Sequence, residues 1–170
     1  MEWVVLKYAS YYSQDNILAS NLFVKGTISY YLYLFISQNP KHSTRFASIV
    51  TSMYLVFAFT NFFFIQGMNQ LNTHCFNAGM LTVIFFVFKY LYDVLFSTES
   101  IVITRLPLFW LGAGIIYFYC SLFPILTFFN PLLKLEPDFL ENLYNLVPIG
   151  NIFLYLGYLM FILCPAVIKN

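Results

Sequence analysis

The chain has 170 residues, of which 61% are hydrophobic and 9% charged, and its net charge is +1. A soluble domain carries about 25% charged residues and leaves much of its surface exposed, so this composition argues against a soluble fold and indicates that lipid is the solvent. No basic run is present to neutralise a series of phosphates, which argues against a nucleic-acid partner.

The first fifteen residues, MEWVVLKYASYYSQD, are too short to span a membrane but are rich in aromatic side chains. Tryptophan and tyrosine favour the headgroup region of a bilayer, and the segment lacks the small-residue cleavage site of a signal peptide. We therefore expect residues 1–15 to form an interfacial segment on the membrane surface.

Apolar runs that are long enough to cross a membrane follow one another along the rest of the chain. A spanning helix needs about 20 mostly apolar residues, and such runs lie at about 17–37, 46–66, 76–96, 107–130 and 147–168. An open sheet cannot satisfy its backbone groups in lipid, so the runs predict helices. The expected fold class is all-α: a polytopic transmembrane helix bundle with about five spanning helices, in which residues 1–170 form a single integral membrane domain.

The fourth run, PLFWLGAGIIYFYCSLFPILTFFN, carries two features of the backbone. Gly112 and Gly114 allow a neighbouring helix to approach closely. Pro124 removes one internal hydrogen bond and favours a kink, which is a candidate hinge. After this run, residues 136–146 place apolar side chains on one face and acids on the other, which predicts a short external helix lying on the membrane surface.

The basic residues predict the orientation. Lys41 and Arg45 lie between the first and second runs, Arg105 lies before the fourth, and Lys169 follows the fifth. The connection at 67–75 has no charged residue. Because lysine and arginine are enriched in cytoplasmic connections, the N-terminus is expected outside and the C-terminus inside.

Polar side chains gather near the predicted outer ends of the helices, and they form the candidate ligand-binding set: Lys25, Asn61, Gln66, Asn72, His74, Asn77 and Asn151. Two interpretations stay open for the amides. They can join helices through hydrogen bonds, or they can line a water-accessible pocket that opens outward. His74 is either an ordinary surface residue or a pH-sensitive group.

Lys25 is the most informative single residue, because it lies within the predicted span 17–37. Inserting a lysine inside a span costs about 2.5–3.5 kcal/mol on insertion scales. One interpretation is that its side chain extends outward to Asp15 or to the headgroups. The other is that it faces the bundle and pairs with an anionic ligand, or with an acid of the 131–146 connection.

The sequence contains no motif for a catalytic centre. It lacks HExxH, GxSxG, a phosphate loop and paired carboxylates within a span. Cys75, Cys120 and Cys164 form no CxxC pair and are expected to be packing residues. We therefore expect no catalytic residue, no metal and no cofactor, and the sequence favours a protein that is not an enzyme.

Short motifs in the second half carry a resemblance to a known family. The first two are an outer Asn-Thr turn at Asn72 and Thr73 and a tyrosine-rich helix with Tyr90 and Tyr92. The others are the beginning of the fourth run, with Pro107, Phe109 and Trp110, and the beginning of the last, with Asn151, Leu154 and Tyr155. Over roughly residues 30–167, the chain resembles the small uncharacterised multi-pass inner-membrane proteins of Bacteroidetes-type bacteria. The resemblance implies a bacterial inner-membrane location and a shortened member, with about five of seven helices.

The family also carries a histidine and a glutamate early in the helix that corresponds to the first run, where this chain has SNLFVKGTISYY. A function that depends on those two residues is therefore not implied here. The resemblance implies no established activity, and an association with histidine-kinase signalling is the one functional expectation that comes with it.

Three functions are compatible with the sequence. The first is a non-enzymatic membrane subunit, receptor-like and sensory or acting as a scaffold, which works through another membrane or signalling protein or through self-association. The second is a transport or pore-forming subunit, and the third is an intramembrane enzyme. Short cytoplasmic connections leave no room for an output domain, which favours the first.

The predicted orientation can be tested by labelling single cysteines in a background that lacks the native ones. Gln70→Cys and Pro137→Cys should react with a membrane-impermeant reagent in intact cells, because both lie in predicted outer connections. Ser43→Cys should react only after the cells are opened. Labelling of Ser43→Cys in intact cells would reverse the orientation.

Overall fold

The computed structural model describes residues 14–67, 71–96, 103–127 and 146–164, and these parts of the chain are all-helical. The α-helices are α2 (Gln14–Ser37), α3 (Thr44–Thr60), α4 (Thr73–Leu95), α5 (Pro107–Thr127) and α8 (Leu146–Leu163), with a π-helical turn η2 (Asn61–Ile65) and a 3-10 turn η3 (Ile103–Arg105). The expectation of an all-helical chain is confirmed, and one α-helix coincides with each predicted run. The predicted segments at 1–15 and 136–146 lie almost entirely outside the described residues.

The helix boundaries follow local hydrogen bonds. Ser43 precedes α3, and its hydroxyl accepts a hydrogen bond from the backbone N–H of Phe46 at 3.2 Å, which is a standard N-cap. At its far end α3 continues directly into η2, so this helical segment reaches Ile65. The helix α5 continues through Pro124 as far as Thr127.

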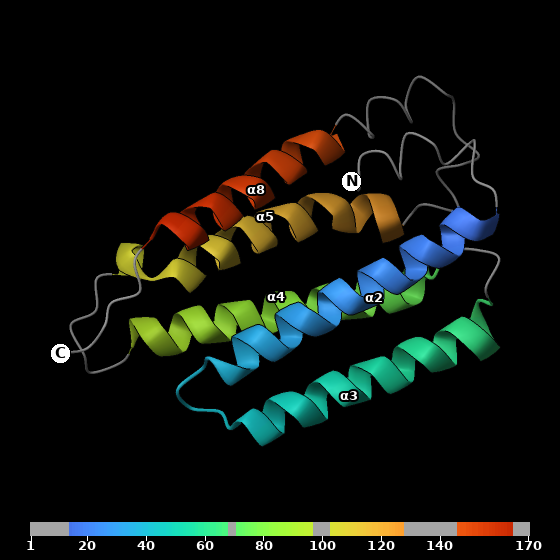
Figure 1. The fold of residues 1–170 in the computed structure, drawn as a ribbon, viewed down its shortest axis with the longest axis horizontal. Coiled ribbons are helices and arrows are strands. Elements are labelled where there is room, and N and C mark those ends of the chain that lie inside the picture. Colours follow the sequence, from blue (N-terminus) through green and yellow to red (C-terminus); the bar gives the residue numbers. More distant parts are fainter. Residues whose placement is uncertain (1–13, 68–70, 97–102, 128–145, 165–170) are drawn as a thin grey trace.

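The helices form an up-and-down bundle in which helices that follow one another in the chain run in opposite directions (Figure 1). The pair α2 and α4 lies at the centre of the arrangement. The helix α3 packs mainly on α2, α5 packs on α4, and α8 packs on α5. The helices α3 and α8 therefore lie on opposite sides of the bundle (Figure 1).

The core lies where α2, α4 and α5 meet. Fully buried side chains recur every three or four residues on each of these helices, as a single inward face requires. They include Ile28, Leu32 and Phe35 on α2, Val83 and Val87 on α4, and Leu111 and Ile115 on α5.

Where α5 and α8 cross most closely, backbone contacts backbone. A Cβ placed on Gly114 would lie 3.0 Å from the carbonyl oxygen of Phe153 and 3.3 Å from the Cα of Gly157. A Cβ on Gly157 would lie 2.8 Å from the carbonyl oxygen of Trp110. Only glycine permits the two helices to approach this closely. Gly112 faces the other neighbour of α5, since a Cβ there would lie 2.9 Å from Cγ1 of Val87 on α4.

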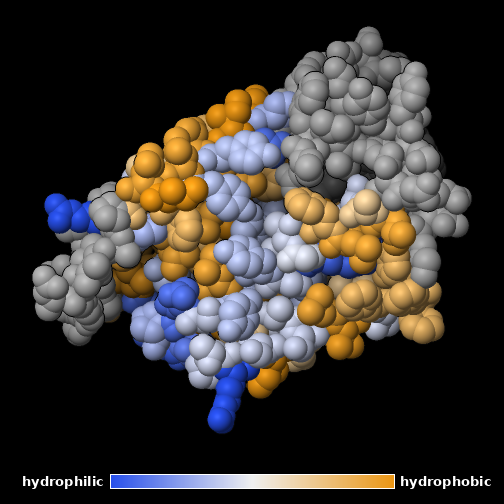
Figure 2. All heavy atoms as spheres, in the orientation of Figure 1, coloured by the Kyte–Doolittle hydropathy of each residue, from blue (hydrophilic) through white to orange (hydrophobic). Residues whose placement is uncertain are grey.

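Large apolar side chains cover much of the outer surface. Val56 on α3 is 67% exposed, Phe64 on η2 is 84% exposed and Ile162 on α8 is 76% exposed. Figure 2 shows hydrophobic side chains over α8 and over the right-hand parts of α2 and α3. Among the described helices, two are long and apolar enough to cross a membrane by length and composition, Thr44–Ile65 and Thr73–Leu95.

The glycine contact yields a prediction about stability. Gly157→Ala should destabilise the purified protein by about 1–3 kcal/mol, because the added methyl group meets a backbone carbonyl that has no freedom to move aside. Thermal unfolding in mild detergent measures the change.

Gly26→Ala is the matched control, since a Cβ on Gly26 meets no atom within 4 Å. Removing a glycine from an open helical position should leave stability unchanged or raise it by about 0.5–1 kcal/mol. Equal effects of the two substitutions would show that the α5–α8 contact tolerates a side chain.

Candidate functional site

The candidate site lies where α3 ends and α4 begins. At this point the backbone N–H of Gln66 donates to the carbonyl of Asn61 at 2.9 Å, a bond over five residues that defines the π-helical turn. Gly67 follows with a φ of +77°, in the left-handed region that favours glycine. Together the wide turn and Gly67 reverse the chain toward α4. Isolated π-helical turns are frequent at functional sites.

The side chain of Gln66 holds this junction together. Its Oε1 accepts hydrogen bonds from Nδ2 of Asn61 at 2.8 Å and from the backbone N–H of His74 at 3.2 Å. Its Nε2 donates to Oγ1 of Thr73 at 3.1 Å. The first N–H groups of a helix have no partner within the helix, and Gln66 supplies one of them with an acceptor. This explains why α4 begins at Thr73, three residues before the predicted run.

Lys25 enters the junction from α2 and is 2% exposed. Its Nζ lies 3.8 Å from the centre of the Phe62 ring, a cation–π contact. With the Asn72 amide turned so that its oxygen faces Lys25, Oδ1 accepts from Nζ at 3.1 Å and Nδ2 donates to the Gly67 carbonyl at 3.2 Å. Of the two interpretations from sequence, the structure has Lys25 facing the bundle.

Asn21 ties the same region to α2. It is fully buried, and its Oδ1 accepts a hydrogen bond from the backbone N–H of Asn72 at 3.1 Å. Asn21, Phe62 and Thr73 were not part of the predicted set. The spacing of Asn21 and Lys25, four residues apart on one helical face, is the sequence signal that would have found the first of them.

The structure divides the predicted site residues into groups. Lys25, Asn61, Gln66 and Asn72 come together at the junction, and His74 joins them through its backbone while its side chain is exposed. Asn77 lies one turn further along α4, and its enclosed Oδ1 accepts no hydrogen bond from the described residues.

Asn151 does not lie with this group. It is buried in α8, which packs along α5, whereas Asn61 lies at the end of α3 on the other side of the bundle (Figure 1). The interpretation that Asn151 lines one outward-opening pocket together with Asn61 therefore has no support in the helix arrangement. Their similar depth along the bundle axis does not make their helices neighbours.

A second polar cluster occupies the opposite end of the bundle. Asp93 near the end of α4 is 2% exposed, and its carboxylate accepts from Nζ of Lys41 at 2.7 Å, Nζ of Lys89 at 3.2 Å and Nδ2 of Asn39 at 2.9 Å. Lys89 and Asp93 are four residues apart on α4, the spacing of an ordinary local ion pair. In the structure, Asn39 and Lys41 of the α2–α3 connection also donate to this carboxylate. The buried carboxylate is therefore surrounded by donors and holds the connection against α4.

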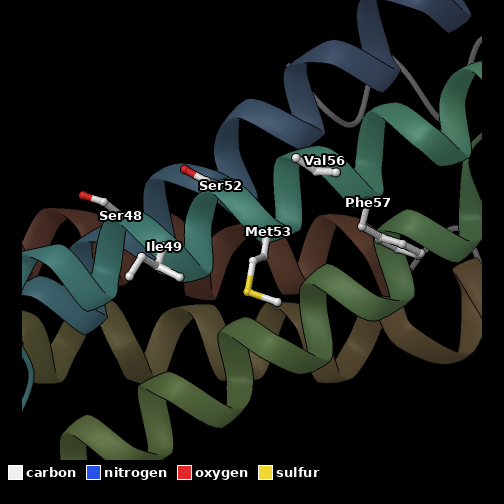
Figure 3. A pocket seen from close by; sticks show the side chains of 6 residues that line it. All are labelled: Ser48, Ile49, Ser52, Met53, Val56 and Phe57. Atoms are coloured by element: carbon white, nitrogen blue, oxygen red, sulfur yellow. The ribbon is translucent and has the colours of Figure 1, made fainter.

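A groove on the outer face of α3 is apolar and lies away from both polar clusters. Figure 3 shows its lining side chains, of which Ile49, Met53, Val56 and Phe57 are apolar and Ser48 and Ser52 are polar. No charged side chain lines it, so its chemistry suits hydrocarbon rather than a polar ligand.

Neither a metal nor a cysteine site is found in the described part of the chain. Its residues include no group of three or more histidine, cysteine, aspartate or glutamate side chains that could hold an ion. Cys75 is buried, with its Sγ 3.3 Å from the hydroxyl of Tyr54, whereas Cys120 is exposed and Cys164 half-buried.

Comparison with protein-family models, curated proteins and solved structures finds no match to this chain.

The hydrogen bonds of Gln66 predict a large effect of its loss. Gln66→Leu should lower the free energy of unfolding by about 1–3 kcal/mol, because it leaves Asn61 and the start of α4 without their acceptor. The exposed Gln38→Leu is the control and should change stability by less than about 0.5 kcal/mol. If both variants unfold at the same temperature, the Gln66 network contributes nothing measurable.

Proposed function

We propose that the chain is a multi-pass protein of a bacterial inner membrane, with its five described α-helices as spans, and that it acts as a non-enzymatic, receptor-like or scaffold subunit. The exposure of large apolar side chains on opposite sides of the bundle supports the membrane location. Val56 on α3 and Ile162 on α8 are each more than two-thirds exposed, which in water would create an aggregation-prone surface.

Hydroxyl groups on the helices support the same location. Thr27, Ser48, Thr60, Thr82 and Ser121 each donate a hydrogen bond to the carbonyl four residues earlier, at 2.7–3.1 Å. A hydroxyl that bonds to its own helix needs no water, which is the arrangement that lipid requires.

The distribution of charge supports the predicted orientation, with the N-terminus outside and the C-terminus inside. Lys41, Arg45, Lys89 and Arg105 all belong to the end of the bundle where α2 and α4 finish and α3 and α5 begin. Cytoplasmic ends are enriched in lysine and arginine. The Lys25 junction belongs to the other end, which is the outer one in this orientation.

The buried cation at that outer end is the observation that carries the receptor-like assignment. Lys25 contacts the amide oxygen of Asn72 and the ring of Phe62, groups that hold and orient a ligand but do not exchange protons at neutral pH. Such an arrangement suits binding rather than catalysis. A binding event here would reposition the start of α4, which runs to the Asp93 cluster at the opposite end.

Fractionation followed by reconstitution tests the proposal. The chain should stay in membranes washed with alkaline carbonate, and after mild solubilisation it should co-purify with a stoichiometric partner protein. Reconstituted alone in vesicles, it should leave an imposed ion gradient intact.

Release by carbonate would contradict the membrane location. Dissipation of the gradient by the purified chain would replace the receptor-like role with the transport or pore role. The chain should be purified from membranes that contain it at its native level. If no other protein elutes with it, self-association replaces a separate partner in the proposal.

A further inference from the structure

Lys25 carries a charge that its described neighbours do not neutralise. Its Nζ contacts the Phe62 ring and the Asn72 amide oxygen, both of which supply only partial negative charge. Within the described residues, the two ion pairs both involve Asp93 at the opposite end of the bundle. A cation enclosed to this degree is costly unless an anion accompanies it.

The start of α4 adds positive potential at the same place. Asn72, whose amide meets Lys25, is the N-cap residue of this 23-residue helix. The N-terminus of a helix carries a partial positive charge and favours anions over cations. An anion between Lys25 and the start of α4 would therefore be attracted by both, whereas without one they repel each other.

Asn61 contributes an unused acceptor beside this positive region. Its side chain is fully buried and its Nδ2 is bonded to Gln66, but its Oδ1 has no hydrogen-bond partner among the described residues. A buried carbonyl oxygen without a donor costs about 1–3 kcal/mol. The neighbouring residue is Phe62, over which Lys25 lies. A ligand that fits here offers both an anion and a hydrogen-bond donor.

The surface next to the junction indicates that this ligand has an apolar part. The η2 turn that begins with Asn61 continues with Phe63, Phe64 and Ile65, three large side chains that all face outward. The polar groups thus lie inside one turn whose outer side is hydrocarbon-like. This is the pattern that an amphiphile requires, with a polar head among the amides and chains along the outer face.

We propose that the junction of α2, η2 and α4 binds one phospholipid whose headgroup combines a phosphate with a hydrogen-bond donor, such as phosphatidylethanolamine or phosphatidylglycerol. Lys25 holds the phosphate, the positive potential at the start of α4 adds to the attraction, and Asn61 Oδ1 accepts from the headgroup ammonium or hydroxyl. The inference rests on the membrane location of the proposed function and adds the class of ligand.

Lipid binding to the delipidated protein, followed by native mass spectrometry and by thermal stabilisation, tests this proposal. The ligands are phosphatidylethanolamine, phosphatidylglycerol, phosphatidylcholine and soluble glycerol 3-phosphate. The first two should bind more tightly than phosphatidylcholine, whose choline group has no donor. Glycerol 3-phosphate has no acyl chains and should bind much more weakly. Equal binding of phosphatidylcholine, or binding of glycerol 3-phosphate as tight as that of the lipids, would overturn the proposal.

Substitutions assign the two parts of the site. Lys25→Met should weaken binding of phosphatidylethanolamine and phosphatidylglycerol about 10- to 100-fold, the range for one charged hydrogen bond. Arg45→Gln removes one cation at the opposite end and should leave affinity unchanged. Asn61→Leu should keep phosphate binding but lose the preference over phosphatidylcholine, whereas Thr51→Val, which also removes an enclosed side-chain oxygen without a partner among the described residues, should keep that preference.

A second pair of variants guards against loss of folding, which far-UV circular dichroism and a monodisperse elution profile monitor. Lys25→Arg should retain binding and Lys25→Gln should lose it, and equal binding by the two overturns the role of the charge. A protein that resists carbonate extraction but shows no dependence on residue 25 would contradict this inference alone. Carbonate release would instead contradict the proposed function on which it rests.

Discussion

The side-chain amide of Gln66 is the constraint on which the rest of the candidate site depends. Two antiparallel helices, α3 and α4, meet here through a short connection, and the free N–H groups at the start of α4 must find acceptors away from water. Gln66 meets this need and at the same time bonds Asn61 and Thr73. Because the connection is fixed, Asn72 lies where Asn21 and Lys25 of α2 can reach it.

The two ends of the bundle handle buried charge in opposite ways. At one end, a carboxylate, Asp93, is enclosed by two ammonium groups and an amide, so positive charge is in excess and faces outward through Lys41. At the other end a single ammonium group, Lys25, is buried and contacts the amide of Asn72 and the phenyl ring of Phe62. In the first arrangement the buried carboxylate has its positive partners within the described chain, which suits a structural role. In the second, no acidic side chain among the described residues pairs with the ammonium group, and the proposed lipid site rests on this difference.

The helices could be predicted from sequence because apolar runs of this length bounded by polar connections are typical of helices. The π-helical turn could not, since NFFFI is as apolar as the α-helix before it and only the hydrogen bond from Gln66 to Asn61 reveals the extra residue. The grouping of Lys25, Asn61, Gln66 and Asn72 followed from their shared depth. That of Asn151 failed because depth along an axis says nothing about which helices are neighbours.

The glycine contact between α5 and α8 has a consequence for motion. Side chains that separate two helices act as compressible spacers, because their rotamers can change as the helices slide. Gly114 and Gly157 leave no such spacers, so backbone rests on backbone. We therefore expect a displacement of α8 to carry α5 with it at this crossing. Relative movement is easier at the boundary between this pair and α4, where side chains such as Val87 separate the helices.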